Sequence, residues 1–357
     1  MKKIAVICNY TLRPDRVGGM DRFYKLYNQR LKAMEVQVDW YFTNYTPFEF
    51  YKEMNIYNAA GGAVEQLFLT KNSLKNNNYE VIVTHFTELC TSIYKEFHQL
   101  FPKAKIIAVD HNPRPLGGFS LKKRIKKRIS GLLYGKYIDQ FVGVSQYTVN
   151  HILNDYGSYL KSKTNVIYNG VNADVFVKRI QKNKNKFIVA SHLRTSKGIQ
   201  DLIKALSFIG ENLLQNVVID IYGEGPNENN LRELTNNYNL ENIVFFKGSS
   251  AKLNELFCDY AYMIQPTYME CFSLSILESL SANVPVITTT VGGNLEVVEN
   301  GKNGFIYEPG DCKALSIILK GILSGNSSIL EDTTTLIEQE FHLDKMVDKH
   351  IKLLPCI

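Results

Sequence analysis

Two glutamates, Glu270 and Glu278, stand at the ends of the stretch ECFSLSILE, which follows a strand-like run at 260–268. The stretch is expected to leave that strand and open a helix, with Glu270 just outside the helix and Glu278 farther along it. The first carboxylate could contact a sugar, and the second could accept hydrogen bonds from the paired hydroxyls of a ribose. The alternative is an ordinary helix with one acidic residue at its N-terminus and one surface glutamate.

The start of the same helix could bind a phosphate group. N–H groups in a first helical turn have no intrahelical acceptor and carry partial positive charge. Positions 271, 273 and 275 have small side chains, so the backbone would be open to a ligand. The amides expected to face a diphosphate belong to Phe272, Ser273 and Leu274.

A second turn, in SHLRTSKGIQDLI (191–203), carries cations just before a predicted helix. Arg194 and Lys197 would repel the positive end of the helix dipole, which suggests that an anion such as a diphosphate balances them. Two solvated loop cations are the alternative. The chain contains no D-x-D motif, so we expect the diphosphate to be neutralised without a metal ion.

Glycine-rich turns follow other predicted strands. Gly18 and Gly19 precede a helix in RVGGMDRF, where the backbone could approach a phosphate. Gly223 lies in a similar turn, IYGEGP. Turn geometry alone would also explain these glycines, and neither stretch is the G-x-G-x-x-G dinucleotide fingerprint.

Two histidines end predicted strands of the first half. His85 ends YEVIVTH, and His111 ends KIIAVDH. A histidine at the carboxyl end of a strand can face a ligand, whereas the plainer interpretation is a hydrogen-bonded loop histidine. Of the two, His111 is the stronger candidate for a functional role.

These turns all belong to one pattern of short apolar runs that alternate with helical segments. The pattern predicts an α/β protein with parallel sheets covered on both faces, in two Rossmann-like doubly wound domains that face a central cleft. We expect a first domain at 1–176, a polar linker at 177–186 and a second domain at 187–337. A last helix within 338–357 could cap either domain, with packing back on the first as the working expectation.

The bulk composition fits this pattern. A chain of 357 residues with 45% hydrophobic and 21% charged residues suits two globular domains. No apolar run approaches the roughly 18 residues of a membrane span. The six cysteines are scattered without C-x-x-C spacing, so neither a disulfide framework nor a metal site is expected and a reducing cytoplasm fits.

The segment LKKRIKKRISGLL (121–133) is strongly basic and amphipathic. Apolar residues recur in it at helical spacing, which predicts an interfacial helix on an anionic membrane surface. The alternatives are an ordinary amphipathic helix packed on the first domain, or a nucleic-acid patch. The cations expected at the membrane are Lys122, Lys123, Arg124, Lys126, Lys127 and Arg128.

In its motifs and their order the sequence resembles the retaining GT-B glycosyltransferases of family 4. The resemblance covers nearly the whole chain and is strongest over 166–311. The matching segments are VGVSQYT, VIYNGVNADVF, SHLRTSKGIQDLI, IYGEGP, IVFFKG, the E-x7-E pair of ECFSLSILE, and GGNLEVVENGKNGFIYEPGD.

The resemblance implies roles for single residues. Glu270 and His111 would lie near the donor sugar as catalytic residues, Lys197 and Gly19 at the diphosphate, and Glu278 at the ribose, with Gly223 nearby at the nucleoside. Two features depart from the family pattern. The family's usual arginine is His192 here, so that Arg194 would replace it, and Cys271 and Ser273 stand where glycines are common.

The sequence therefore predicts a metal-independent, retaining transferase with no cofactor beyond its co-substrate. It would move a hexose-type sugar from a UDP- or GDP-linked donor to a hydroxyl acceptor. A lipid-linked or polysaccharide glycan of a bacterial surface is the expected acceptor, with the enzyme in the cytoplasm at the inner face of the plasma membrane and with no nucleic-acid partner. The alternatives are a nucleotide-sugar epimerase or hydrolase of the same architecture, or a basic membrane-binding adaptor without catalysis.

Overall fold

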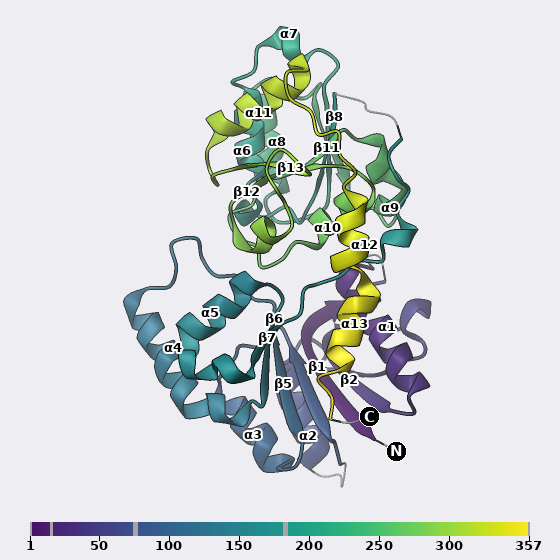
Figure 1. Ribbon diagram of the computed structural model, residues 1–357, viewed down its shortest axis with the longest axis vertical. Helices are drawn as coiled ribbons and strands as arrows, with labels where there is room; N and C mark the ends of the chain where they lie inside the picture. The colour runs from purple at the N-terminus through teal and green to yellow at the C-terminus, as the bar shows by residue number, and fades with distance from the viewer. Residues whose placement is uncertain (1, 15–16, 74–77, 181–184, 356–357) are drawn as a thin grey trace. The chain divides into compact units, whose positions relative to one another are not determined.

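The computed structural model describes residues 2–14, 17–73, 78–180 and 185–355, and it divides into two compact units. Unit 1 comprises Met1–Asn169 and Asp344–Ile357, and unit 2 comprises Gly170–Leu343 (Figure 1). Each unit is a parallel sheet with helices on both faces, which confirms the predicted α/β architecture of two Rossmann-like domains.

Unit 1 holds a seven-stranded sheet in the order β3-β2-β1-β4-β5-β6-β7, with every pairing parallel. The central strands are buried on both faces, as their unbroken apolar sequences require. Its strands are β1 (Lys3–Leu12), β2 (Gln37–Tyr45), β3 (Asn55–Asn58), β4 (Val81–His85), β5 (Lys105–Asp110), β6 (Gln140–Gly143) and β7 (Thr164–Val166).

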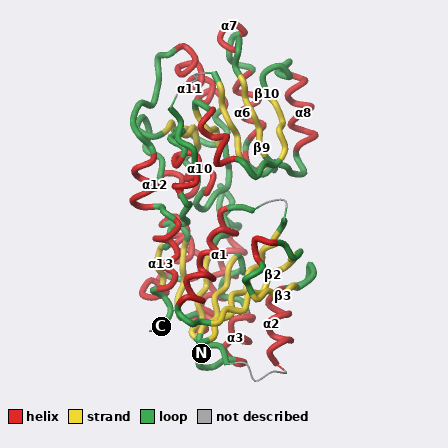
Figure 2. The backbone as a smooth tube through the Cα atoms, turned by 90° about the vertical axis from the view of Figure 1, so that its right-hand side faces the viewer, coloured by secondary structure: helices red, strands yellow, loops and turns green. Residues whose placement is uncertain are grey.

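Helices cover both faces of this sheet. Phe68 of α2 and Phe97 of α3 pack on one face, and Tyr24 of α1 contacts Trp40 of β2 on the other. The tube in Figure 2 shows α1 and α13 on the opposite side of β2 from α2 and α3. The helices of unit 1 are α1 (Gly19–Ala33), α2 (Val64–Ser73), α3 (Ser92–Leu100), α4 (Leu121–Tyr134), α5 (Gln146–Tyr156), α13 (Leu343–Ile351) and the 3-10 turns η1 (Glu49–Tyr51), η2 (Gly135–Tyr137) and η3 (Ser158–Lys163).

Unit 2 has the same kind of architecture, with six parallel strands in the order β10-β9-β8-β11-β12-β13. The strands are β8 (Lys186–Ala190), β9 (Val218–Tyr222), β10 (Val244–Gly248), β11 (Tyr262–Gln265), β12 (Val286–Thr289) and β13 (Gly304–Tyr307). The helices are α6 (Ile199–Leu206), α7 (Glu211–Leu214), α8 (Glu228–Asn237), α9 (Leu253–Leu256), α10 (Leu274–Ser281), α11 (Cys312–Ser324) and α12 (Thr334–Glu340), with η4 (Ala173–Val175), η5 (Thr195–Lys197), η6 (Phe257–Asp259) and η7 (Gly292–Glu296).

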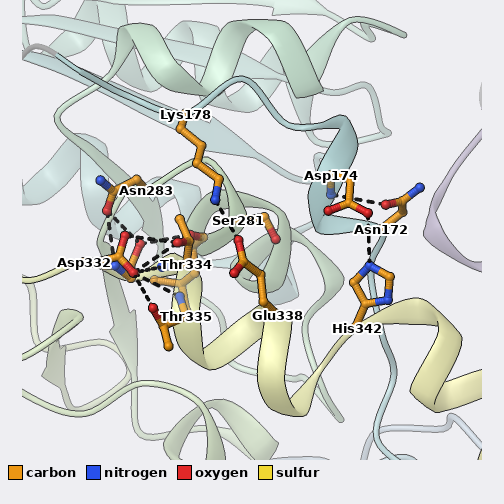
Figure 3. Close-up of polar contacts among 12 residues, drawn as sticks. Asn172, Asp174, Lys178, Ser281, Asn283, Asp332, Thr334, Thr335, Glu338 and His342 are labelled. Atoms are coloured by element: carbon orange, nitrogen blue, oxygen red, sulfur yellow. Dashed lines mark hydrogen bonds and ion pairs between the residues drawn. The ribbon is translucent and has the colours of Figure 1, made fainter.

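The described part of the predicted linker, residues 177–180, is part of unit 2 and not a connection between the units. Lys178 Nζ lies 2.6 Å from a carboxylate oxygen of Glu338 (Figure 3). The buried Arg179 donates to the carbonyl of Ala261. The division between the units falls after Asn169, ahead of the predicted boundary at 176. Residues 181–184 of the predicted linker lie outside the described residues.

The C-terminal segment forms two helices rather than one. Val171 forms a β-bridge with His342, and its N–H and C=O bond to Phe341 and Leu343. These bonds replace helical ones, so α12 ends at Glu340 and α13 begins at Leu343. The residues of α12 belong to unit 2, and those from Asp344 onward belong to unit 1.

Candidate functional site

The main candidate site lies at the carboxyl edge of the sheet in unit 2. The chain runs from β8 outward to β9 and β10 and then returns to place β11 on the other side of β8. Such a reversal opens a crevice beyond the strand ends, where parallel sheets bind their ligands. Lys197 follows β8 and Glu270 follows β11, and the Nζ atom of Lys197 lies 2.8 Å from Oε2 of Glu270. The fold therefore joins two of the predicted residues from separate motifs.

Backbone packing fixes the turn that carries Lys197. Gly198 has a φ of +71° and caps η5, and a Cβ built on it would lie 1.7 Å from the carbonyl oxygen of Pro266. The N–H of Tyr268 donates to the carbonyl of Ser196 at 2.8 Å. Only glycine satisfies both the left-handed backbone and this close approach. The two turns thus form one rigid edge.

A third turn supports Glu270 from the end of β12. A Cβ on Gly292 would lie 2.1 Å from the carbonyl oxygen of Glu270, and Gly293 N–H donates to the carbonyl of Cys271 at 2.9 Å. The N–H of Cys271 donates to Oε1 of Glu270 at 3.2 Å. The carboxylate is therefore held at both oxygens. The sequence showed Gly292 and Gly293 as a turn, but gave no sign that the turn braces Glu270.

The phosphate-binding helix start predicted at 272–275 is α10, which begins at Leu274 with Ser273 as its N-cap. The Ser273 hydroxyl accepts from the N–H of Ile276 at 3.4 Å and from the side-chain amide of Gln265 at 2.5 Å. Phe272 is buried against Phe341. Because Ser273 satisfies the third N–H of the helix, the amides of Leu274 and Ser275 remain as the ones without an intrahelical acceptor.

The remaining predicted residues of unit 2 lie in the turns after β8 and β9 and in α10. Gly223 follows β9, and its turn packs on the carbonyl of Ser191. Arg194 is exposed at the start of η5. Glu278 is half-buried in α10. His192, at the position of the family's arginine, is bonded through its Nδ1 to the carbonyl of Glu224, so its ring supports the β9 turn.

In unit 1 the turn at Gly18 and Gly19 is held by a hydrogen bond to Asp21, a residue that was not predicted from the sequence. Helix α1 begins at Gly19, and the N–H of Gly18 donates to the carboxylate of Asp21 at 2.7 Å. The hydroxyls of Tyr51 and Tyr10 also donate to this carboxylate. Burial raises the pKa of Asp21 above its ordinary value, although these hydrogen bonds oppose the shift. An acidic residue three positions after a helix cap was the available signal.

His85 and His111 end adjacent strands, β4 and β5, and bond to each other. Nδ1 of His85 lies 2.9 Å from Nε2 of His111. Phe86 stacks on the His111 ring with centroids 4.2 Å apart, and its φ of +60° is unusual for a bulky residue. Burial lowers the pKa of His111 to about 3, so this ring is neutral near pH 7. The structure thus joins the two histidines that the sequence considered separately.

Helix α4 buries only Lys127 and Gly131 of its residues. Lys127 is buried, donates to the hydroxyl of Tyr156 at 2.7 Å and lies 3.9 Å from Asp155. The prediction that Lys127 belongs to the membrane-facing surface was therefore wrong, because it anchors α4 to α5. The other five cations are exposed, and so are the apolar residues Leu121, Ile125, Ile129, Leu132 and Leu133. Within the described residues, no helix is long and apolar enough to cross a membrane.

Comparisons with known proteins match this architecture over most of the chain. Residues 17–175 match the family profile Glycosyltransferase Family 4, and residues 171–339 match the profile Glycosyl transferases group 1. HepE of Anabaena, solved in complex with UDP and glucose, superposes with a TM-score of 0.77 over 100% of both chains at 17% identity. At that identity the likeness shows a common fold.

Curated relatives align over parts of the chain. The N-acetyl-alpha-D-glucosaminyl L-malate synthase of Bacillus anthracis is 26% identical over 199 residues, which are 52% of this chain and 51% of that protein. The capsular polysaccharide biosynthesis glycosyltransferase CapM of Staphylococcus aureus is 32% identical over 136 residues, 37% of this chain and 34% of that one. The chain thus spans about half or less of the length of these relatives.

Fold and site together define a GT-B protein, with two Rossmann-like units and a charged site at the strand ends of the second. The chain belongs to the glycosyltransferases, with a family 4 segment followed by a group 1 segment.

Proposed function

We propose that the protein transfers a hexose-type sugar from a nucleotide-diphosphate donor to a hydroxyl acceptor, with retention of configuration and without a metal ion. The observation that carries the proposal is the contact between Lys197 and Glu270 at the reversal point of the second sheet. A cation, a carboxylate and the N-terminus of α10 meet there, and these groups suit a diphosphate joined to a sugar.

The ion pair suggests how a donor would rearrange the site. A diphosphate carries more negative charge than one carboxylate, so it would compete with Glu270 for the ammonium group of Lys197. Glu270 would then lose one partner and keep its bond from the N–H of Cys271. The released carboxylate is free to contact the sugar, while Lys197, the exposed Arg194 and the amides of α10 stabilise the departing diphosphate.

The donor class is tested by thermal shift with UDP, GDP and their sugars, followed by product analysis. A donor present at 100 times its dissociation constant should stabilise the protein by about 2.7 kcal/mol. NMR of the product should show the anomeric configuration of the donor, formed only when an acceptor is supplied. Release of free sugar at the same rate without acceptor would indicate a hydrolase, and an isomerised nucleotide sugar would indicate an epimerase. A non-catalytic adaptor would give no turnover with any donor.

The proposed acceptor is a lipid-linked or polysaccharide glycan, reached from an anionic membrane surface on the cytoplasmic side. Helix α4 supports this part, because its buried Lys127 and Gly131 turn the apolar residues outward. A Cβ on Gly131 would lie 2.1 Å from the carbonyl oxygen of Tyr156, so α4 cannot rotate without losing this close packing. Exposed leucines and isoleucines beside five exposed cations suit a lipid interface better than water.

Vesicle co-sedimentation tests the membrane surface. The intact protein should bind vesicles containing phosphatidylserine, and binding should weaken in neutral vesicles or at high salt. The double variant Ile125→Ser, Ile129→Ser should lose most of this binding without loss of stability. Ile317→Ser serves as the control, because Ile317, on α11 of unit 2, is even more exposed than Ile125 and Ile129. Equal binding by the double variant and the control would contradict the assignment.

A further inference from the structure

The facing ring nitrogens of the bonded histidines in unit 1 have one hydrogen between them. Burial holds the pKa values of His85 and His111 well below the ordinary value, so both rings are neutral near pH 7. At a separation of 2.9 Å, one of the facing nitrogens must donate and the other must accept. Two arrangements are therefore available, with the shared proton on Nδ1 of His85 or on Nε2 of His111.

The surroundings of His85 favour the first arrangement. His85 is 0% exposed, and its second nitrogen, Nε2, is sealed from solvent with no hydrogen-bond partner among the described residues. The rings of Phe23 and Tyr24 lie 5.8 and 5.7 Å from the His85 ring. A neutral imidazole carries one N–H, so a proton on Nε2 would be a buried donor with no oxygen to receive it. A buried N–H without an acceptor is rarer and costs more free energy than a buried acceptor nitrogen without a donor.

It follows that Nδ1 of His85 carries the hydrogen and donates to Nε2 of His111. His111 then holds its own hydrogen on Nδ1. That nitrogen makes no hydrogen bond within the described part of the chain, and it is not among the sealed atoms. It lies just beyond β5, next to β4 and near the reversal point of the first sheet between β1 and β4. Ligands of such sheets bind at this place.

We propose that His85 is a positioning residue that fixes His111 as an Nδ1–H donor, so that His111 gives a hydrogen bond to an oxygen of the bound sugar substrate and does not act as a base. The identity of the ligand rests on the proposed glycosyl transfer, whereas the tautomer rests on the geometry of unit 1 alone.

Phe86 fixes the orientation of the His111 ring. Its ring stacks on His111 with an interplanar angle of 19°, while its backbone adopts a φ of +60°. A left-handed conformation at a non-glycine residue is strained, and such strain persists where the surrounding structure enforces it. The hydrogen bond from His85 and the stacked Phe86 together fix both the proton and the plane of the His111 ring.

NMR of the full chain with ¹⁵N-labelled histidine tests the tautomer directly, because the two ring nitrogens differ in chemical shift when one is protonated. His111 should be protonated on Nδ1 in the wild type. His85→Phe fills the space without a donor and should release His111 to a mixture of tautomers. His85→Asn retains an N–H near the position of Nδ1 and should preserve the wild-type signal. A wild-type His111 protonated on Nε2 would overturn the inference, and so would a signal unchanged in His85→Phe.

Kinetics test the ligand role separately. With an active donor, His85→Phe should lower kcat/KM about tenfold, as for one lost hydrogen bond to substrate, and His85→Asn should recover most of the loss. Equal kinetics in all three proteins, with the tautomers as expected, would overturn the contact with sugar. If no nucleotide sugar binds at all, the proposed function fails while the NMR result still decides the tautomer.

Discussion

Glu270 is held by three groups that come from three parts of the chain. Lys197 contacts one carboxylate oxygen, the N–H of Cys271 donates to the other, and the turn at Gly292 packs against its backbone. These three contacts are not expected for an ordinary surface glutamate at the start of a helix. The arrangement is that of a positioned carboxylate, which suits a group that must meet a particular atom of a substrate.

Glu270→Gln is expected to separate binding from turnover. The neutral amide keeps the size of the side chain but no longer attracts Lys197, so UDP or GDP should bind at least as tightly as in the wild type. Turnover should fall by roughly 100-fold or more, because the charge beside the reacting sugar is lost. Calorimetric titration and a steady-state assay measure the two effects. Undiminished turnover would remove Glu270 from the chemistry.

Three features of single residues could not be predicted from the sequence. Lys197 and Glu270 could be proposed singly from their turns, but their contact depends on β8 and β11 being neighbours in the sheet. Lys127 was placed on the wrong face, because a run of cations gives no sign that one of them will be buried under Tyr156. Asp21 escaped notice because two of its three donors, Tyr10 and Tyr51, come from separate segments.

At the scale of elements, the adjoining turns after β8 and β11 form the support of the site. Gly198→Ala is expected to destabilise unit 2 by about 2–4 kcal/mol, because the methyl group meets the carbonyl of Pro266 and the backbone is left-handed. Gly248→Ala is the matched control. Its φ is +69°, but a Cβ there would meet nothing within 4 Å, so it should cost only about 1 kcal/mol.

Urea unfolding separates the effect on each unit. The single tryptophan, Trp40, is buried in β2 of unit 1, so its fluorescence reports that unit alone. Circular dichroism reports both units. Gly198→Ala should shift the dichroism transition and leave the tryptophan transition in place. Equal losses in Gly198→Ala and Gly248→Ala would show that the close approach to Pro266 is unimportant.

The central strands were predictable from sequence because an unbroken apolar run that alternates with helical segments is typical of a strand buried on both faces of a parallel sheet. The strands that escaped were β2, β3, β7 and β13. Of these, β3 (NIYN) and β7 (TNV) are short, polar edge strands that carry little apolar signal. The end of α12 was also missed, since the bonds from Val171 that end it come from a segment far away in the chain.

The whole chain forms most of unit 1 first, then unit 2, and its last residues, in α13, belong to unit 1 again. His350 on α13 is buried against Phe23 of α1, with ring centroids 4.9 Å apart. Burial, assisted by the nearby His111, lowers the pKa of His350 to about 3. The returning segment therefore brings a third neutral histidine into the interior of unit 1, near His85 and His111.

These histidines make unit 1 sensitive to acid. Their folded pKa values lie below the unfolded value of about 6.5, so the unfolded chain binds more protons below that pH. The contribution of the neutral histidines to stability is fully present above about pH 6.5. It should fall as the pH drops below that value, by up to about 1.4 kcal/mol per pH unit for each histidine, and for His111 and His350 the fall should continue toward pH 3. His350→Phe should reduce this slope, measured by Trp40 fluorescence in urea at pH 7 and pH 5. The exposed His98→Gln should leave it unchanged, and an unaltered slope in His350→Phe would contradict the account.

The most direct test of the account is calorimetric titration of UDP and GDP into wild-type protein, Lys197→Met and Lys204→Met. Lys204 is an exposed lysine on α6, the helix that follows Lys197, so it controls for general charge. We expect that at least one nucleotide binds, that Lys197→Met weakens its affinity tenfold or more, and that Lys204→Met changes its affinity less than twofold. Equal affinities of all three proteins for the nucleotide would contradict the claim that Lys197, in the turn after β8, binds the diphosphate.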